Sequence, residues 1–169
     1  MNQDGDRFVN ESRAYDRAGR EIIAQLRDGS LTLPYWMIYD DREGEVPPVK
    51  AANVSIVETQ KYLAAGLWHT ADTLAELADK IGVPGGRLAA TVARFNGFAA
   101  SGVDEDFGRG NSAYDRYYGD PTNKPNPNLG EIKHGPFYAA KMVPGDLGTK
   151  GGIVTDIHGR ALRVDGSVI

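Results

Sequence analysis

Tyrosine is the side chain in this sequence that offers the most obvious acid-base chemistry. The chain contains eight Tyr and no Cys, which excludes a thiolate nucleophile, a thiolate zinc site and an iron–sulfur cluster. Tyr114, Tyr117 and Tyr118 fall close together in a glycine-rich stretch. A tyrosine base that works near neutral pH needs its pKa lowered by about three units, which requires about 4 kcal/mol of favourable environment. Most tyrosines instead pack their rings and point their hydroxyls to water, and this alternative stays open for each one.

A second chemical signal is the glycine-rich segment 144–152, which places four glycines in nine residues just before a predicted strand. Backbone without side chains can approach a flat ligand closely there. The segment is not a phosphate-binding loop, because it matches neither GxGxxG nor GxxxxGK[ST]. A plain turn at the start of a strand explains the glycines equally well.

Other polar and aromatic residues favour structural roles. His69, His134 and His158 are scattered without ligand-like spacing, so no metal site is predicted. The acidic run 104–106 is expected to be solvated. Residues 61–69 contain Leu and Trp side chains and are expected to pack in a core or between domains.

The length and charge of the chain predict one soluble folded domain over residues 1–169. A chain of 169 residues buries about 70% of its extended surface on folding, which suffices for one core. Its 19 Lys+Arg and 23 Asp+Glu give a net charge of -4, and no cationic stripe suits nucleic acid. No window approaches the roughly 18 apolar residues of a membrane span. The absence of cysteine and the polar stretch 1–16 favour a cytoplasmic location.

The first elements alternate in type. Residues 16–27 repeat apolar side chains at helical spacing, and Gly29 is a plausible stop, which predicts a helix. Residues 35–39 are aromatic and branched and follow Pro34, which predicts a buried strand. A polar loop is expected to follow at 42–48.

Two adjacent helices are predicted next. The segment 70–81 has one apolar face, with Thr70 or Asp72 as its N-cap and Gly82 just after its end. A further helix is expected over 84–102. The link between the two helices is so short that they must be neighbours in space.

The last third of the chain predicts a long loop and then short strands. Residues 101–131 are rich in Gly, Asp, Asn and Pro and are expected to be mostly irregular. Strands are predicted at 137–143, 153–156 and 161–164, the last two joined by a hairpin turn at His158-Gly159. Helices grouped ahead of strands favour an α+β fold, with a small, mostly antiparallel sheet flanked by helices.

Several strings resemble a known family in their order along the chain. Residues 7–12 (RFVNES), 94–96 (RFN) and 148–156 (GTKGGIVTD) resemble the fumarate-reductase and succinate-dehydrogenase-like flavoprotein superfamily. The stretches 112–130 and 135–152 are similar specifically to the 3-ketosteroid Δ1-dehydrogenases.

This resemblance implies an FAD-dependent enzyme that desaturates the A ring of a 3-ketosteroid. In that family a base takes the proton from C2 while a hydride passes from C1 to the flavin. Family members hold FAD in a Rossmann-like domain, and this chain looks like the inserted substrate-binding domain alone. No segment supplies the strand, glycine turn and helix that seat a pyrophosphate, so tight FAD binding and turnover by this chain alone are not expected.

The resemblance also implies roles for individual residues. The family's base is a Tyr shortly after the Asn-Glu string, which places that role on Tyr15, four residues after Glu11. Positive charge on Arg13 or Arg17 would lower the pKa of a nearby phenol, and the alternative is that both side chains face solvent. The expected substrate contacts are Leu147, Thr149, Tyr114, Tyr117 and Tyr118, and the expected cofactor contacts are Gly151 and Gly152.

Two alternatives stay open beside this interpretation. One is another flavoprotein of the superfamily, such as a Δ4-type steroid dehydrogenase or a fumarate reductase-like enzyme. A fumarate reductase needs cations to clamp two carboxylates, whereas Tyr15 stands where such a charge is expected. The other is a non-catalytic module that binds a steroid or a protein partner. The expected partners are a 3-ketosteroid and the FAD domain of the same protein, with self-association where that domain is missing.

Overall fold

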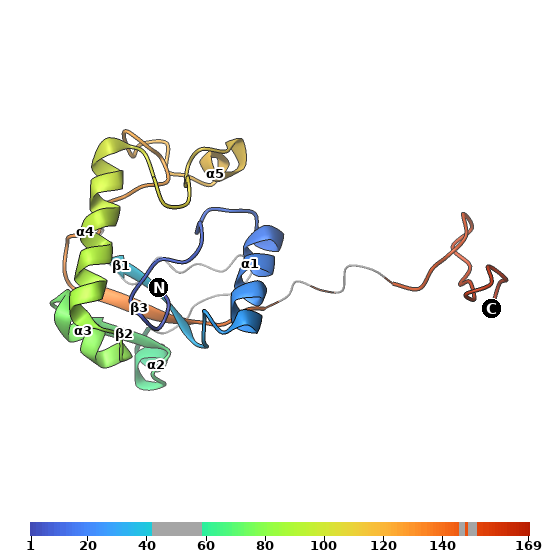
Figure 1. Ribbon diagram of the computed structural model, residues 1–169, viewed down its shortest axis with the longest axis horizontal. Helices are drawn as coiled ribbons and strands as arrows, with labels where there is room; N and C mark the ends of the chain where they lie inside the picture. The colour runs from blue at the N-terminus through green and yellow to red at the C-terminus, as the bar shows by residue number, and fades with distance from the viewer. Residues whose placement is uncertain (42–58, 146–147, 149–151) are drawn as a thin grey trace.

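The computed structural model describes residues 1–41, 59–145, 148 and 152–169 of the chain. Helices surround a small sheet, and the C-terminal segment projects away from them (Figure 1). In chain order the elements are α1 (Tyr15–Asp28), β1 (Tyr35–Asp40), α2 (Thr59–Ala64), β2 (Trp68–Ala71), α3 (Leu74–Ile81), α4 (Gly85–Ser101), α5 (Ala113–Tyr117) and β3 (Phe137–Met142).

The three strands form one antiparallel sheet in the order β1-β3-β2. In the register of the sheet, Ala139 of β3 lies between Ile38 of β1 and His69 of β2. Side chains alternate between the two faces of a strand, so Trp36, Ile38, Ala139 and Ala71 share one face. These residues belong to or pack on the main hydrophobic core. The predicted α+β fold with a small antiparallel sheet is confirmed.

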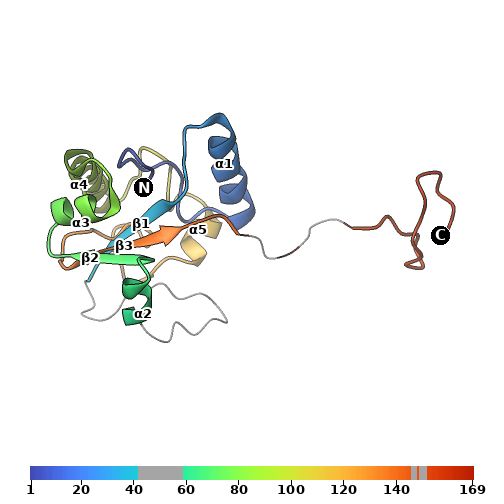
Figure 2. The same ribbon diagram turned by 90° about the horizontal axis from the view of Figure 1, so that it is seen from below.

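Helices α3 and α4 pack against each other and provide most of the remaining core (Figure 2). Leu77 of α3 and Leu88 of α4 are both fully buried. Burying a leucine side chain contributes about 1.5–3 kcal/mol, so such contacts fix the helix pair on the sheet. The predicted neighbourhood of these two helices is confirmed.

The start of α3 differs from the prediction. Its N-cap is Thr73, not Thr70 or Asp72, because Thr70 belongs to β2 and only the Thr73 hydroxyl reaches the first turn. Thr73 Oγ1 accepts a hydrogen bond from the Glu76 backbone N–H at 3.2 Å, and Glu76 Oε2 accepts one from the Thr73 backbone N–H at 3.3 Å. This reciprocal pair is a capping box, which sets the first residue of the helix.

The other regular elements agree closely with the sequence. The predicted helix at 16–27 forms α1 and ends at Gly29, whose φ of 81° is left-handed. The predicted strands at 35–39 and 137–143 form β1 and β3. The polar loop expected at 42–48 lies outside the described residues.

Three short elements were not predicted. The strand β2 begins in the stretch 61–69 that the sequence assigned to apolar packing and continues into the segment 70–81 that was predicted as a helix, and α2 precedes it. Trp68 is indeed buried, although Leu67 is 42% exposed. The helix α5 lies within the segment 101–131, whose remaining residues form turns and bends.

The C-terminal segment 152–169 extends away from the helices and the sheet in both views (Figures 1 and 2). The strands predicted at 153–156 and 161–164 are present only as isolated bridges, which join Thr155 to Ala161 and Leu162 to Val168. The predicted hairpin turn does form, since the Gly159 N–H donates to the Asp156 carbonyl at 3.0 Å. A short pair of segments that packs no hydrophobic face against a core is too weakly stabilised to form longer strands.

Candidate functional site

Tyr15 is the first residue of α1 and its side chain is 57% exposed. The N-cap residue of α1 is Ala14, whose side chain cannot accept a hydrogen bond from the backbone N–H groups of the first turn. The neighbouring Arg13 forms an ion pair with Glu21, two turns further along the same helix. This ion pair holds the residues just before Tyr15 against α1. It also engages Arg13, which is one of the two cations expected to act on the Tyr15 phenol.

The tyrosines of the long loop gather on α5. Ser112 caps this helix, because its Oγ accepts a hydrogen bond from the Asp115 backbone N–H at 3.0 Å. The ring centroids of Tyr114 and Tyr118 are 5.4 Å apart, and those of Tyr117 and Tyr118 are 4.9 Å apart. All three rings are exposed, Tyr117 most of all. A short helix therefore presents three aromatic rings on the surface.

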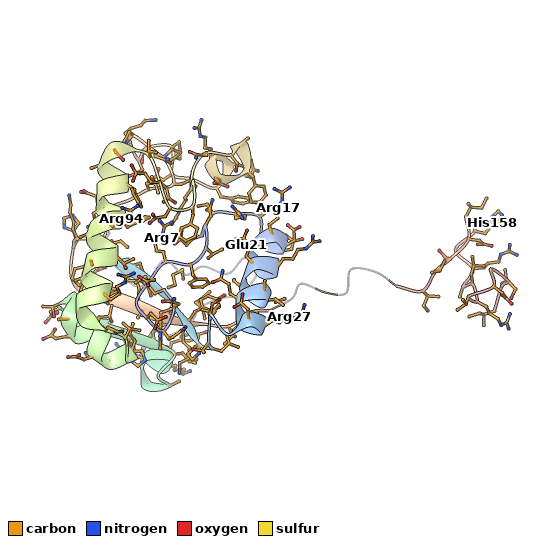
Figure 3. All side chains as sticks on the ribbon, in the orientation of Figure 1. Arg7, Arg17, Glu21, Arg27, Arg94 and His158 are labelled. Atoms are coloured by element: carbon orange, nitrogen blue, oxygen red, sulfur yellow. The ribbon has the colours of Figure 1, made fainter. Side chains whose placement is uncertain are left out.

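The first turn of α1 lies beside α5 in both views, and Figure 3 shows Arg17 at this end of α1. Desolvation, the nearby Tyr118 and the charges of Tyr15 and Asp16 raise the pKa of Tyr114 above its ordinary value. Tyr15 is thus within electrostatic reach of Tyr114. We call Tyr15, Tyr114, Tyr117 and Tyr118 the tyrosine cluster. Ring contacts join the three tyrosines of α5, and the first turn of α1, which begins at Tyr15, lies beside that helix.

A buried carboxylate fixes this arrangement. Asp115 is 3% exposed and its two oxygens accept hydrogen bonds from Asn10 Nδ2 at 3.1 Å, from the Gly110 N–H at 2.9 Å and from Ser112 Oγ at 2.6 Å. Burial alone raises the pKa of Asp115, but these hydrogen bonds and the charge of Arg13 hold it below its ordinary value. The carboxylate therefore stays ionised and joins α5 to the segment that leads into α1.

A second contact repeats this connection. Asn128 Nδ2 donates to the Asp115 backbone carbonyl at 2.7 Å and lies 3.2 Å from Ser12 Oγ. The Arg109 guanidinium donates to the same Ser12 oxygen at 2.9 Å. Ser12 is therefore hydrogen-bonded to two separate parts of the loop 101–131, at Arg109 and at Asn128.

An arginine cluster anchors the beginning of the same segment. Arg7 forms bidentate hydrogen bonds with Glu11 and with Asp104, at distances of 2.9–3.0 Å. Its guanidinium lies 5.0 Å from the ring centroids of both Phe95 and Phe107. Such a guanidinium, stacked and doubly paired, is a rigid anchor rather than a free cation.

The carboxylates of this cluster are ionised. Desolvation opposes the charge on Asp104, but its hydrogen bond from Arg7 and the Arg109 backbone N–H keep the pKa of Asp104 below its ordinary value. The pKa of Glu11 is lowered in the same way by Arg7 and Arg109 against desolvation. Asp104 is only 2% exposed, so the prediction of a solvated acidic run is wrong for this residue. Long-range pairing with Arg7 explains why it is buried.

A cavity of about 600 Å³ lies between α4 and the segment around Arg7. It is lined by paired charges: Arg87 binds Asp6 at 2.6 Å, and Arg94 binds Asp106 at 2.7 Å. Figure 3 shows Arg7 and Arg94 on the side of α4, away from the start of α1. A flat apolar ligand prefers walls of hydrophobic and aromatic side chains, so this cavity does not suit it.

The remaining site predictions fall elsewhere. Leu147, Thr149 and Gly151 lie outside the described residues. Gly152 is exposed, and no atom lies within 4 Å of the position its Cβ would take. It begins the C-terminal segment, and no described contact joins it to the tyrosine cluster.

The described residues do not by themselves fit FAD. A dinucleotide is normally held at the N-terminus of a helix that follows a parallel strand and a glycine turn. The described strands form only antiparallel pairs. Within the described part of the chain, no group of three His, Asp or Glu side chains suits a metal ion, and no helix is long and apolar enough to cross a membrane.

Comparison with known proteins now decides the family. The sequence profile described as "FAD binding domain" matches residues 1–169. The chain belongs to this FAD binding domain family. Within the family, it is 56% identical over its whole length to the 3-oxosteroid 1-dehydrogenase of Mycolicibacterium smegmatis, of which it covers 30%. It is 44% identical over its whole length to the 4-oxocyclohexanecarboxylate 2-dehydrogenase of Sinomonas cyclohexanicum, of which it covers 29%.

A solved structure of the FAD binding domain family supports the same relationship. The crystal structure of 3-ketosteroid delta1-dehydrogenase from Sterolibacterium denitrificans, in complex with 1,4-androstadiene-3,17-dione, matches 99% of this chain with a TM-score of 0.84 and 33% identity. The match covers 30% of that protein's chain. The chain thus spans about a third of the length of its relatives. The described residues form an α+β fold with one antiparallel sheet.

The sequence pattern points to the tyrosines as candidates but not to the residues that position them. Four polar residues connect α5 with the segment that leads into α1: Asn10, Ser112, Asp115 and Asn128. The spacing of Ser112 and Asp115, three residues apart, is a helix N-cap signal that predicts α5. The pairing of Asn10 with Asp115 spans 105 residues, and no local pattern in the sequence reports it.

Proposed function

We propose that this chain is the substrate-binding part of an FAD-dependent 3-oxosteroid 1-dehydrogenase and supplies the proton acceptor for the reaction. The observation that carries the proposal is the 56% identity over the whole chain to a protein of that name. The exposed tyrosine cluster at the start of α1 supports it, because it offers a phenol beside aromatic walls.

The reaction removes one hydrogen from each of two adjacent ring carbons. The C3 carbonyl acidifies the C–H bonds at C2, so a base that accepts this proton generates the electron pair for the new C1–C2 double bond. We assign that base to Tyr15, whose phenolate oxygen forms the new O–H bond. An FAD held by the rest of the flavoprotein would supply the acceptor for the hydride from C1.

Exposure of Tyr15 in this chain agrees with a site completed by another part of the protein. A phenol with an ordinary pKa near 10 needs neighbouring donors or cations before it acts as a base near neutral pH. Arg17 lies on the same end of α1, whereas Arg13 is paired with Glu21 (Figure 3). We infer that the positive charge of Arg17 and hydrogen bonds from the cluster supply the remaining effect, and that they outweigh the desolvation by bound substrate, which disfavours the phenolate.

The other site residues keep their proposed roles. Tyr114, Tyr117 and Tyr118 wall the substrate site on the side of α5. Leu147 and Thr149 are proposed to contact the steroid, and Gly151 and Gly152 to approach the flavin with bare backbone. The FAD-binding part of the same protein is the proposed partner.

A second candidate substrate class follows from the relative in Sinomonas cyclohexanicum. That protein is named for desaturation of a 4-oxocyclohexanecarboxylate, which is also a cyclic ketone with acidic hydrogens beside its carbonyl. The lower identity, 44% against 56%, places it second. The two substrates differ in size and charge, so one assay separates them.

A chimera tests the proposal. Residues 1–169 replace the matched segment of the Mycolicibacterium smegmatis enzyme, and turnover is followed with a dye as electron acceptor. The proposal predicts desaturation of 4-androstene-3,17-dione, and none by the 169-residue chain with FAD alone. Preference for 4-oxocyclohexanecarboxylate selects the second class. A folded, flavin-loaded chimera that is inactive on every cyclic ketone indicates a non-catalytic binding module.

Two further properties belong to the proposal. We infer a cytoplasmic location from the composition of the sequence, which fractionation of cells that express the tagged chain would test. We also infer that the isolated chain self-associates, because apolar side chains such as Ile157 and Ile153 are largely exposed. Sedimentation over a range of concentrations would test this.

A further inference from the structure

The helices α1 and α5 present the tyrosine cluster, but neither of them packs closely against another described helix or strand. In α1 only Ile22 is buried, and the N-cap residue Ala14 provides no side-chain hydrogen bond. The helix α5 has five residues and a single buried side chain, Asp115. Packing of an apolar face usually fixes a helix in place, so polar contacts set the distance between these two helices instead.

A turn immediately before α1 determines where this helix begins. The Arg13 N–H donates to the Asn10 carbonyl at 3.2 Å, and the Ser12 N–H donates to Asn10 Oδ1 at 2.9 Å. These two hydrogen bonds close residues 10–13 into a compact turn that ends one residue before Ala14. Any movement of this turn therefore moves Tyr15, the first residue of the helix.

The Ser12 hydroxyl joins that turn to the loop on both sides of α5. Its Oγ accepts a hydrogen bond from Arg109 Nε at 2.9 Å, before α5, and one from Asn128 Nδ2 at 3.2 Å, after α5. Asn128 is 7% exposed, and its Nδ2 also donates to the Asp115 backbone carbonyl at 2.7 Å. One side chain thus connects the turn before α1 with the backbone of α5.

A second link between the same segments is the hydrogen bond from Asn10 to Asp115, which is fully buried. Its loss strands a buried carboxylate and affects folding directly. The Ser12 side chain is only half-buried, and its partner Arg109 also pairs with Glu11 at 3.2 Å. Loss of the Ser12 hydroxyl is therefore expected to loosen the junction between the helices more than it destabilises the fold.

We propose that Ser12 is a positioning residue, whose hydroxyl fixes the distance between Tyr15 and the tyrosines of α5. This role rests on the proposed function, in which Tyr15 is the base and α5 walls the substrate site. A substrate contacts both helices at once, so only molecules with the correct distance between them bind it. When the junction is loosened, fewer molecules are competent to bind, and the apparent affinity falls by the same factor.

A distance measurement tests the inference without substrate or flavin. The chain contains no Cys, so nitroxide labels can be attached at two chosen positions. Ala24→Cys on α1 and Ala113→Cys on α5 replace exposed alanines, and pulsed EPR measures the distances between the labels. The distribution should be narrow in this labelled chain, clearly broader with Ser12→Ala, and narrow again with Ser12→Thr, which keeps the hydroxyl. Ser30→Ala, just beyond the other end of α1, is the matched control and should leave it unchanged.

The chimera adds a kinetic measurement that a purely structural residue would not change. Ser12→Ala should raise KM for 4-androstene-3,17-dione about tenfold, the effect of losing one or two hydrogen bonds. The change in kcat should be less than about twofold, because bound steroid holds both helices in place. A residue that only stabilises the fold would instead lower the amount of active protein and leave KM unchanged.

The outcomes separate this inference from the proposed function. An unchanged distance distribution in Ser12→Ala overturns the inference, whatever the chimera does, and so does a KM that stays within twofold in an active chimera. Equal broadening in Ser30→Ala or in Ser12→Thr overturns it too, since the effect would not depend on the Ser12 hydroxyl. If Ser12→Ala does not fold, Arg109→Lys decides, because it removes the Nε donor to Ser12 and keeps a charge for Glu11: partial broadening supports the inference and none overturns it. A flavin-loaded parent chimera without activity contradicts the proposed function instead.

Discussion

The side-chain amide of Asn10 donates a 3.1 Å hydrogen bond to the buried carboxylate of Asp115, across 105 residues of sequence. This contact joins the approach to α1 with α5 and so brings Tyr15 near Tyr114. The site is assembled by polar contacts of loops, whereas the sheet and the α3–α4 pair form the apolar core beside it. Substitutions in the apolar core therefore change stability without removing a contact of the site, whereas substitutions in the loop contacts affect both.

Replacement of Asp115 should destabilise the chain. Asp115→Ala leaves Asn10, the Gly110 N–H and Ser112 without their acceptor, and should lower the free energy of unfolding by about 2–3 kcal/mol. Urea unfolding measures this. Asp79→Ala, at an exposed position of α3, is the control and should change the value by less than about 0.5 kcal/mol. Equal effects of the two substitutions would contradict the role given to Asp115.

Two glycines with similar backbone angles should respond differently to alanine. Gly29 has a φ of 81° and open space around it, so Gly29→Ala should cost about 1 kcal/mol, the price of a left-handed residue. Gly110 has a φ of 88°, and a Cβ there would overlap the Asn126 side chain. Gly110→Ala should therefore cost clearly more in urea unfolding. A similar cost at both positions would indicate that the loop around Gly110 adapts.

The apolar core should be sensitive to truncation of Leu88. This side chain is fully buried against α3 and the sheet, so Leu88→Ala should lower the free energy of unfolding by about 2–5 kcal/mol. Leu67 is 42% exposed, and Leu67→Ala should cost less than about 1 kcal/mol. Thermal or urea unfolding compares them. A larger loss at Leu67 would show that the described core is not the main one.

Stability should fall in acid because of Asp104. Its pKa is lower in the folded chain than the ordinary 3.8, so ionised Asp104 stabilises the fold fully above that value. The contribution is lost as the pH falls below 3.8 and through the lower folded value. In Asp104→Asn the free energy of unfolding should be lower near neutral pH and should depend less on pH in this range. Urea unfolding at a series of pH values measures both, and an unchanged pH dependence would contradict the pairing with Arg7.

The sequence predicted those parts of the fold that depend on local patterns. The helical repeat before Gly29, the apolar face ending at Gly82 and the aromatic run at 35–39 each contain their own signal. The strand β2 has only four residues and is defined by pairing with β3, so its signal lies elsewhere in the chain. The strands predicted near the C-terminus have suitable residues but only isolated partners, and they remain bridges.

The candidate site also contains residues with a local signal in the sequence and residues without one. Tyr15 and the tyrosines of α5 are site candidates because residue type and family resemblance point to them. The burial of Asp104 was missed because its partner, Arg7, lies 97 residues away. Asp115 was missed for the same reason, although Ser112 marks the start of its helix. Distant partners of this kind leave no periodic pattern, and only the folded chain shows them.

In the proposed function, Tyr15 accepts the substrate proton. Its most direct test is the rate at which the chimera desaturates 4-androstene-3,17-dione, compared between Tyr15 and Tyr15→Phe proteins that bind flavin and unfold alike. Loss of a general base typically costs a factor of about 10²–10⁴, and a decrease of at least 10² is predicted for kcat. A Tyr15→Phe chimera that keeps nearly the full rate would contradict the claim and place the base on another residue.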